Sequence, residues 1–284
     1  MKQYIQELEK RNNREKGEWI KEFLSARQIP FSIQKFSTIF ARGENIIVDY
    51  PFNSRSDAKK TMLSAHYNAW FGTPGANDNA SGVSVLLRFV ERLLKESKNQ
   101  PIRIIFFDLE DGWATRGGSR AYAREYGVHD VHEMYNLEMV GMGSHLLLWP
   151  GQKDETARTW LTPLVEHARS LGLGVVHAPQ ARIEIVNFLT PFGFVSDHVT
   201  LIESGCERAV ALTTIPAEDM RYTPQILDGK RKLRFAFSIL AYRLFGLGTA
   251  PKLLRHYHNK NDRSEFVEQK NLDTILELLW RVVR

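Results

Sequence analysis

The stretch that decides the fold class is Ile102-Arg-Ile-Ile-Phe-Phe107, followed directly by Asp108-Leu-Glu110-Asp111. A continuous apolar run with β-branched residues is typical of a strand that is buried on both faces of a parallel sheet. Two adjacent carboxylates just beyond such a strand need a positive partner if they are buried, and a divalent metal is one such partner. Taken alone, the Glu110-Asp111 pair favours the alternative, a solvated acidic loop.

Strands and helices alternate on both sides of this stretch. The alternation predicts an α/β fold, a three-layer sandwich in which a central mixed, mostly parallel sheet is flanked by helices. We expect a single domain over residues 1–284, and a substrate-side loop within 178–196, which fits neither pattern. Strands are expected at two places within 31–50 and at 61–65, 102–107, 131–140, 145–149 and 209–214; helices are expected at 4–27, 80–95, 118–126, 155–171, 227–247 and 264–283.

Composition, net charge and cysteine count indicate an ordinary globular protein and exclude several kinds of partner and site. Of the 284 residues, 43% are hydrophobic and 25% are charged, which is ordinary for a globular protein with a large core. The net charge of +5 is spread along the chain without a long basic run, so we expect no nucleic-acid partner. The single cysteine, Cys206, excludes an intramolecular disulfide and a cysteine-based zinc cluster. The charged N-terminus and the lack of a long apolar run predict no signal peptide, no membrane contact and a cytoplasmic location.

Side chains that can bind a metal follow the predicted strands. His66 follows the strand at 61–65, Glu138 ends the segment 131–138, and Asp78 lies in a loop rich in Gly, Asn and Asp. Because sites in open α/β sheets form at the carboxyl ends of the strands, we expect these side chains to lie close together. Taken singly, each has a plainer explanation: Asp78 as a helix N-cap, and His66 as a hydrogen-bonded structural histidine.

Near the C-terminus, Arg255-His-Tyr-His-Asn-Lys-Asn-Asp262 contains two histidines, His256 and His258, and a trailing carboxylate. Imidazole is the commonest metal ligand, and a nearby carboxylate can orient it. We expect His256 to be structural or to support a ligand.

Together these segments resemble the M28 family of zinc aminopeptidases, whose close relatives include the glutaminyl cyclases. Six pieces match in order along the chain. They are Ser64-Ala-His66-Tyr67, Gly75-Ala-Asn-Asp78-Asn-Ala-Ser-Gly82, Phe106-Phe-Asp-Leu-Glu110-Asp111 with Gly118-Ser119 downstream, Asn136-Leu-Glu138-Met-Val-Gly141, Ser196-Asp197-His198, and Tyr257-His258 with Asp262.

The resemblance implies a zinc-exopeptidase-like fold and a role for each matching residue. Asp78 would bridge two zinc ions, through a cis peptide to Asn79. His66 and Glu138 would complete the shell of one ion, and Asp111 and His258 that of the other. Glu110 would be the general base of an aminopeptidase that hydrolyses the N-terminal residue from peptides with a metal-activated water.

The match has departures. Asp111 stands where the family usually has Glu, and Glu138 stands where it usually has Asp, so the reach of each ligand changes by one methylene. Asn68 replaces the Asp that normally orients the first histidine, and loss of such a carboxylate can cost about 10 to 100-fold in metal affinity or activity. Two alternatives therefore stay open: a single-zinc glutaminyl cyclase that uses Asp78, Asp111 and His258, and a non-catalytic peptide-binding relative.

The substrate is expected to be a peptide or an aminoacyl small molecule. Trp70, Phe71 and Trp113 are candidates for its pocket, with core packing as an equal alternative. Asp197 and His198 are expected to line the cleft or to support it. The sequence contains nothing that identifies an oligomer interface.

Overall fold

A mixed sheet of eight strands forms the centre of the computed structural model, which describes residues 1–52, 58–112, 116–150, 156–177, 196–222 and 250–283. The strand order is β1-β2-β4-β3-β5-β8-β6-β7. The strands are β1 Ser32–Ser37, β2 Arg42–Tyr50, β3 Lys60–His66, β4 Ile102–Phe107, β5 Val131–Leu137, β6 His145–Pro150, β7 Gly174–His177 and β8 Ala209–Ile215.

The middle of the sheet is parallel and its flanks are mixed. Strands β4, β3, β5 and β8 run in one direction, as the apolar run at 102–107 predicts. The hairpin β1–β2 joins β4 antiparallel, while β6 runs antiparallel to β8 and parallel to β7. The predicted α/β class with a mixed sheet is confirmed.

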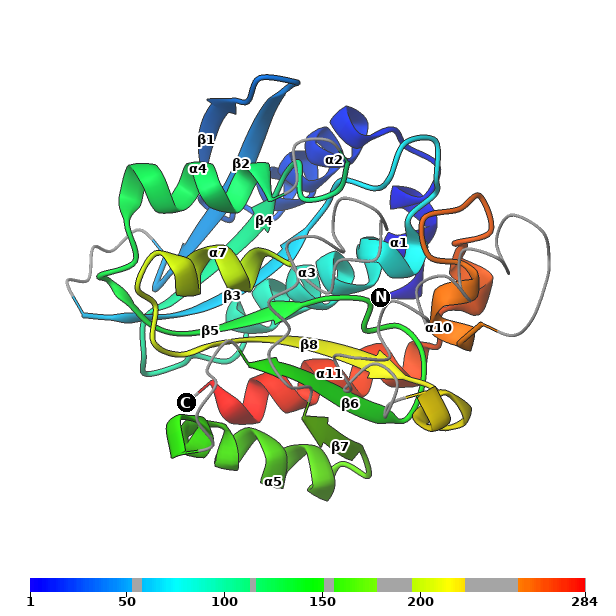
Figure 1. The fold of residues 1–284 in the computed structure, drawn as a ribbon. Helices are drawn as coiled ribbons and strands as arrows, with labels where there is room; N and C mark the ends of the chain where they lie inside the picture. The colour runs from blue at the N-terminus through cyan, green and yellow to red at the C-terminus, as the bar shows by residue number, and fades with distance from the viewer. Residues whose placement is uncertain (53–57, 113–115, 151–155, 178–195, 223–249, 284) are drawn as a thin grey trace.

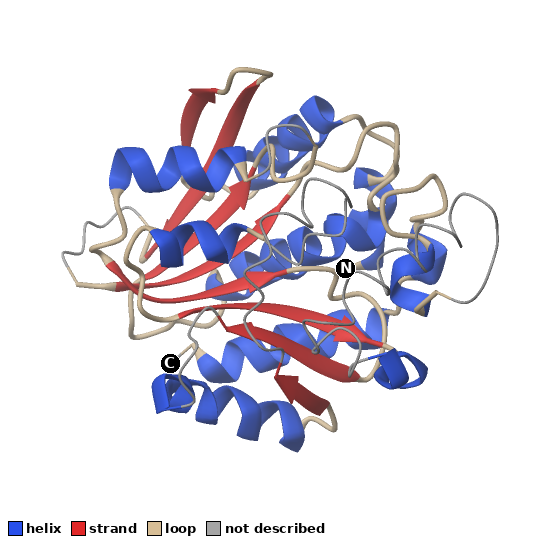
Figure 2. Ribbon diagram, viewed as in Figure 1, coloured by secondary structure: helices blue, strands red, loops and turns tan. Residues whose placement is uncertain are grey.

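Helices cover both faces of this sheet, which gives three layers (Figures 1 and 2). The larger core joins the sheet to α1, α2, α3, α5 and α11, and a smaller core on the other face joins it to α4 and α7. The α-helices are α1 Lys2–Leu8, α2 Asn13–Ala26, α3 Ser81–Leu93, α4 Gly117–Tyr126, α5 Thr162–Ser170, α7 Asp197–Glu203, α10 Lys252–Arg255 and α11 Gln269–Val282. Shorter helical turns are η1 Ala76–Ala80, η2 Thr156–Leu161, η3 Ala217–Tyr222 and η4 Ser264–Phe266. Among these residues, no helix is long and apolar enough to cross a membrane.

Several predicted boundaries were wrong for local reasons. The helix predicted at 4–27 is two helices, because Asn12 caps α2 through a capping box with Glu15. The strand predicted at 131–140 ends at Leu137, since Met139 takes a left-handed φ of 52° and turns the chain. The helix predicted at 264–283 begins only at Gln269, after η4.

Other differences concern whole elements. The helix predicted at 155–171 begins as η2, and α5 follows with a proline in its first turn, where proline is tolerated. Strand β7 and helix α7 were not predicted. The predicted helix at 227–247 lies outside the described residues, and so does nearly all of the stretch 178–196.

The parallel strands bring the candidate ligands to one edge of the sheet. His66, the last residue of β3, pairs with Phe107, the last residue of β4. Ser64 of β3 pairs with Asn136 of β5, so Glu138 follows at the same edge. The residues that come directly after these strands therefore share one end of the molecule, as expected from the sequence.

Candidate metal centre

The carboxylate of Asp78 lies between two histidines. Its Oδ1 is 3.4 Å from Nε2 of His66, and its Oδ2 is 3.3 Å from Nε2 of His258. Each histidine also faces a second carboxylate: Nε2 of His66 is 3.2 Å from Oε1 of Glu138, and Nε2 of His258 is 2.9 Å from Oδ1 of Asp111. Two sets of three ligands thus share Asp78, and within each set the ligand atoms lie within 4.8 Å of one another.

The donor atoms fit a divalent cation such as zinc. Imidazole nitrogen and carboxylate oxygen are its usual ligands in sites that lack cysteine. Oδ2 of Asp78 and Oδ2 of Asp111 are buried, yet neither accepts a hydrogen bond within the described part of the chain. Because buried polar atoms are nearly always paired, these two oxygens are suited to hold a cation.

The candidate ligand side chains shift one another's pKa values. Burial opposes protonation of both histidines, but Glu138 and Asp78 hold the pKa of His66 well above its usual range, and Asp111 and Asp78 raise the pKa of His258 to about 9. Burial likewise opposes ionisation of Asp78, yet His258 and His66 hold its pKa below the usual range. A metal ion must displace protons from the imidazoles, so metal binding should weaken as pH falls.

The turn that presents Asp78 is held from two sides. Its peptide bond to Asn79 is cis, as the family resemblance implies. On one side, Asp262 accepts hydrogen bonds from the backbone N–H groups of Asn77 (2.8 Å) and Asp78 (2.9 Å). On the other side, the Asn79 amide donates to the carbonyl of Leu137 (2.7 Å), which ties the turn to the end of β5.

Asn68 supports the site, although it lacks the carboxylate that is usual there. Its backbone carbonyl lies 2.9 Å from Nδ1 of His66 and can accept a hydrogen bond from a proton on that nitrogen. The other ring nitrogen, Nε2, is then free to bind a metal. Its side-chain oxygen accepts from the backbone N–H of Glu110 (2.9 Å), and its amide donates to the carbonyl of Asp111 (3.4 Å). Asn68 therefore links the loop after β3 to the two acidic residues after β4.

Glu138 has a partner that the sequence reasoning did not single out. The hydroxyl of Ser196 donates to Oε2 of Glu138 over 2.6 Å and accepts from the Asn136 amide over 2.8 Å. Ser196 precedes α7, so the Ser196-Asp197-His198 motif is placed against the end of β5. The position of Ser196 in that matched motif was the sequence feature that could have identified it as a partner of Glu138.

Glu110 lies beside the candidate ligands. Its Oε2 is 3.9 Å from Nε2 of His66, and its backbone follows Leu109, which has a left-handed φ of 53°. Burial raises the pKa of Glu110 well above its usual range; His66 opposes this shift, and Asp111 and Glu138 add to it. A general base works best when its pKa lies near the working pH, and a raised carboxylate pKa moves in that direction.

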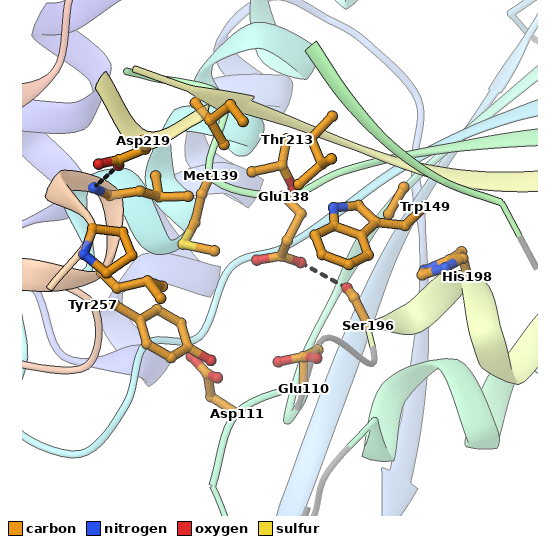
Figure 3. A pocket seen from close by; sticks show the side chains of 16 residues that line it. Glu110, Asp111, Glu138, Met139, Trp149, Ser196, His198, Thr213, Asp219 and Tyr257 are labelled. Atoms are coloured by element: carbon orange, nitrogen blue, oxygen red, sulfur yellow. Dashed lines mark hydrogen bonds between the residues drawn. The ribbon is translucent and has the colours of Figure 1, made fainter. Parts of the chain in front are cut away.

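A pocket opens beside these carboxylates and encloses about 840 Å³, including its open mouth (Figure 3). Figure 3 shows Glu110 and Glu138 turned toward the same space, with Trp149 between Glu138 and His198. Most of the remaining lining is apolar. It consists of Met139, Leu147, Trp149, Ala211, Ile215, Pro251, Leu253, Leu254 and Tyr257, with Ser196, His198, Thr213 and Asp219 as its other polar members.

The predicted substrate-binding residues take different places. His198 lines the pocket, and Asp197 is fully buried next to it in the chain. Trp70 stacks on His258 and is not among the lining residues, and Phe71 is 64% exposed. Trp113 lies outside the described residues.

Comparison with known proteins agrees with this arrangement. The family model of peptidase family M28 matches residues 45–283. A vacuolar membrane protease of Laccaria bicolor is 25% identical over 132 residues, which are 45% of this chain and 12% of that protein. The chain thus spans only a small part of the curated relative that it matches.

Two solved structures share the fold. A zinc aminopeptidase from Bacillus subtilis superposes with a TM-score of 0.59 at 21% identity, covering 85% of this chain and 49% of that one. A glutaminyl cyclase from Tannerella forsythia superposes with a TM-score of 0.66 at 15% identity, covering 99% of this chain and 95% of that one. Since the family model covers most of the sequence and the fold agrees, the chain belongs to peptidase family M28.

Proposed function

We propose that the protein is a zinc-dependent aminopeptidase that hydrolyses the N-terminal residue from peptides. The observation that carries the proposal is the Asp78 carboxylate, which has one oxygen toward His66 and the other toward His258. Such a carboxylate can hold two cations at once. The zinc aminopeptidase with the same fold supports the choice of metal.

Each ligand set would hold one of two ions. His66, Asp78 and Glu138 would hold one ion, and Asp78, Asp111 and His258 the other. When bound, zinc would polarise the scissile carbonyl and lower the pKa of the attacking water. Glu110, buried beside both sets, accepts the proton of that water and delivers it to the leaving amine.

The apolar pocket suggests which N-terminal residue is preferred. Trp149, Leu147 and Leu253 would surround a side chain that enters past Glu138. Burying an apolar side chain there is favourable by about 25 cal/mol per Å² of area removed from water. We therefore expect a large aliphatic or aromatic N-terminal residue to be cleaved faster than a charged one.

A second candidate is cyclisation of N-terminal glutamine with a single zinc. It is favoured by the shortest distance between two of the proposed ligand side chains, 2.9 Å between His258 and Asp111, which with Asp78 would form the whole one-metal set. In that reaction the substrate's own amine attacks its γ-amide, and ammonia leaves. The glutaminyl cyclase with the same fold supports keeping this candidate.

The test measures zinc per chain by elemental analysis and turnover of leucyl, phenylalanyl and glutamyl anilides beside a glutaminyl peptide. Close to two ions with fast leucyl or phenylalanyl turnover supports the aminopeptidase, and one ion with release of ammonia supports the cyclase. Asp78→Asn should lose metal and activity together. Asp130→Asn, at the opposite end of the sheet, is the matched control that should lose neither. A wild-type chain that takes up no zinc would refute both candidates.

A further inference from the structure

Lys16 is a buried cation behind the metal centre. It lies in the first turns of α2 and is only 1% exposed, although lysine is almost never fully buried unless it is paired. Burial lowers the pKa of Lys16 to about 8, while the nearby carboxylates of Asp262, Asp78 and Asp111 oppose the shift. An ammonium group in this place needs a local reason, because burying a charge costs free energy unless it is compensated.

The direct contact of Lys16 is with the turn that carries Asp78. Its Nζ donates a hydrogen bond to the carbonyl of Pro74 over 2.9 Å. The next residue, Gly75, has a φ of +65° and directly precedes η1. A Cβ added to it would lie 3.2 Å from Nζ of Lys16 and 2.5 Å from the Cβ of Ala69. The lysine thus fills the space directly behind the entrance to this turn.

The face of α2 that carries Lys16 also contacts the loop that follows His66. Asn13, three residues before Lys16, exchanges two hydrogen bonds with Ala69, one from its amide to the carbonyl (2.9 Å) and one from the backbone N–H to Oδ1 (2.8 Å). Gly17 lets the helix approach Tyr67, whose Oη would be 3.1 Å from an added Cβ. Residues three and four apart share one helix face, so this face holds both sides of the loop between His66 and Asp78.

Asp262 also holds this turn. Both of its oxygens accept backbone N–H groups of the turn, and the carboxylate is 3% exposed. Asp262 and Asp78 place two carboxyl groups close together in the protein interior, and burial together with Asp78 raises the pKa of Asp262 to about 7. Lys16 supplies a positive charge close to these carboxylates while its Nζ is bonded to the carbonyl of Pro74.

We propose that Lys16 is a positioning residue for the metal centre: it holds the turn from Pro74 to Asp78 so that the two oxygens of Asp78 face the two histidines before a metal arrives. The inference rests on the proposed metal site. The positive charge of Lys16 by itself repels a cation, whereas its hold on the turn favours binding. We expect the effect on the turn to outweigh the charge repulsion, so that Lys16 increases zinc affinity.

The experiment compares Lys16→Met, which keeps the length of the stem but loses the donor, with Lys16→Gln, which keeps a donor without the charge. Zinc affinity is measured by chelator competition, and hydrogen exchange of residues 75–80 is measured on metal-free protein. We expect about 10 to 100-fold weaker zinc binding for Lys16→Met, a smaller loss for Lys16→Gln, and faster exchange of the turn in both. Lys21→Met is the matched control on the same helix, where the lysine pairs with Glu18 and Glu44 away from the turn.

Zinc binding by Lys16→Met that is as tight as wild type, or tighter, would overturn the proposal. A lysine that only stabilised the fold would lower the melting temperature of the metal-free protein without changing the rise in melting temperature that zinc produces. If Lys16→Met does not fold, Lys16→Gln decides by the same two measurements. If wild-type protein binds no zinc, the proposed function fails, while unchanged exchange of residues 75–80 in the metal-free variants would separately refute the hold of Lys16 on the turn.

Discussion

The indole of Trp70 stacks on the imidazole of His258, with ring centroids 4.6 Å apart and an angle of 15° between the planes. Tyr257 stacks on the same imidazole at 3.7 Å and 21°. His258 itself has a left-handed φ of 54°, which is uncommon for a residue with a side chain. The orientation of this imidazole is therefore set by aromatic contacts as well as by Asp111 and Asp78.

Replacing Trp70 should weaken the metal site that contains His258. Aromatic stacking contributes about 0.5–1.5 kcal/mol beyond area burial, so Trp70→Leu should reduce zinc affinity by about 2 to 10-fold. Trp70→Phe keeps a ring and should show a smaller loss. Chelator competition measures both, and Phe40→Leu, at an exposed position on the β1–β2 turn, is the control. Unchanged affinity in Trp70→Leu would show that the stack does not orient the ligand.

Glu110→Gln separates metal binding from catalysis. The change removes the proton acceptor and keeps the size of the side chain, so zinc content should stay at the wild-type level. Turnover of leucyl anilide should fall by about 10² to 10⁴-fold, the usual contribution of a general base. The exposed Glu96, which pairs with Arg92, gives the control Glu96→Gln. Full activity in a zinc-loaded Glu110→Gln protein would remove Glu110 from the mechanism.

Ser196→Ala tests the support of Glu138. The variant loses the 2.6 Å hydrogen bond to Oε2 of Glu138 and leaves the Asn136 amide without its acceptor. Zinc affinity at the His66 side should fall by about 10 to 100-fold, as measured by stepwise titration.

Ser84→Ala is the matched control for Ser196→Ala. The hydroxyl of Ser84 is buried in α3 and has no hydrogen-bond partner among the described residues. Its loss should leave zinc binding unchanged and should not lower the free energy of unfolding, since an unpaired polar group is removed. Equal zinc affinity in both serine variants would contradict the role given to Ser196.

His198 should make the fold sensitive to acid. Burial, together with Arg116, lowers the pKa of His198 to about 3, whereas the pKa of histidine in an unfolded chain is about 6.5. Between these values the unfolded chain binds more protons, so the free energy of unfolding falls with decreasing pH by up to about 1.4 kcal/mol per unit.

Urea unfolding at pH 7 and pH 5 measures this effect. Between pH 7 and pH 5 the free energy of unfolding should fall by about 2 kcal/mol less in His198→Asn than in wild type. His198 contributes only over the roughly 1.5 pH units that lie below the unfolded pKa of about 6.5. His132→Asn, at an exposed position, should behave like wild type. An identical loss in His198→Asn would mean that His198 is not buried as a neutral imidazole.

Much of the fold could be predicted from local patterns. The apolar run at 102–107 indicates a buried parallel strand; β4 is buried and runs parallel to β3, although its other neighbour, β2, is antiparallel. The spacing of Val83, Leu86, Leu87, Val90 and Leu94 indicates a helix. The first four side chains are buried in α3, whereas Leu94 caps the end of this helix and is 48% exposed. At two of the wrong predictions a single residue explains the difference: Asn12 caps α2 and divides the predicted first helix, and the left-handed Met139 ends β5.

The sequence by itself determined the ligand types, their order along the chain, and their gathering at one edge of the sheet, because strand periodicity and the shared direction of parallel strands are local and topological properties. Only the tertiary structure decided which atoms complete the site. The carbonyl of Asn68 meets His66, the hydroxyl of Ser196 meets Glu138, and Lys16 reaches Pro74 from a helix nearly sixty positions earlier in the chain. Such contacts depend on packing between distant segments, which no local pattern of residues encodes.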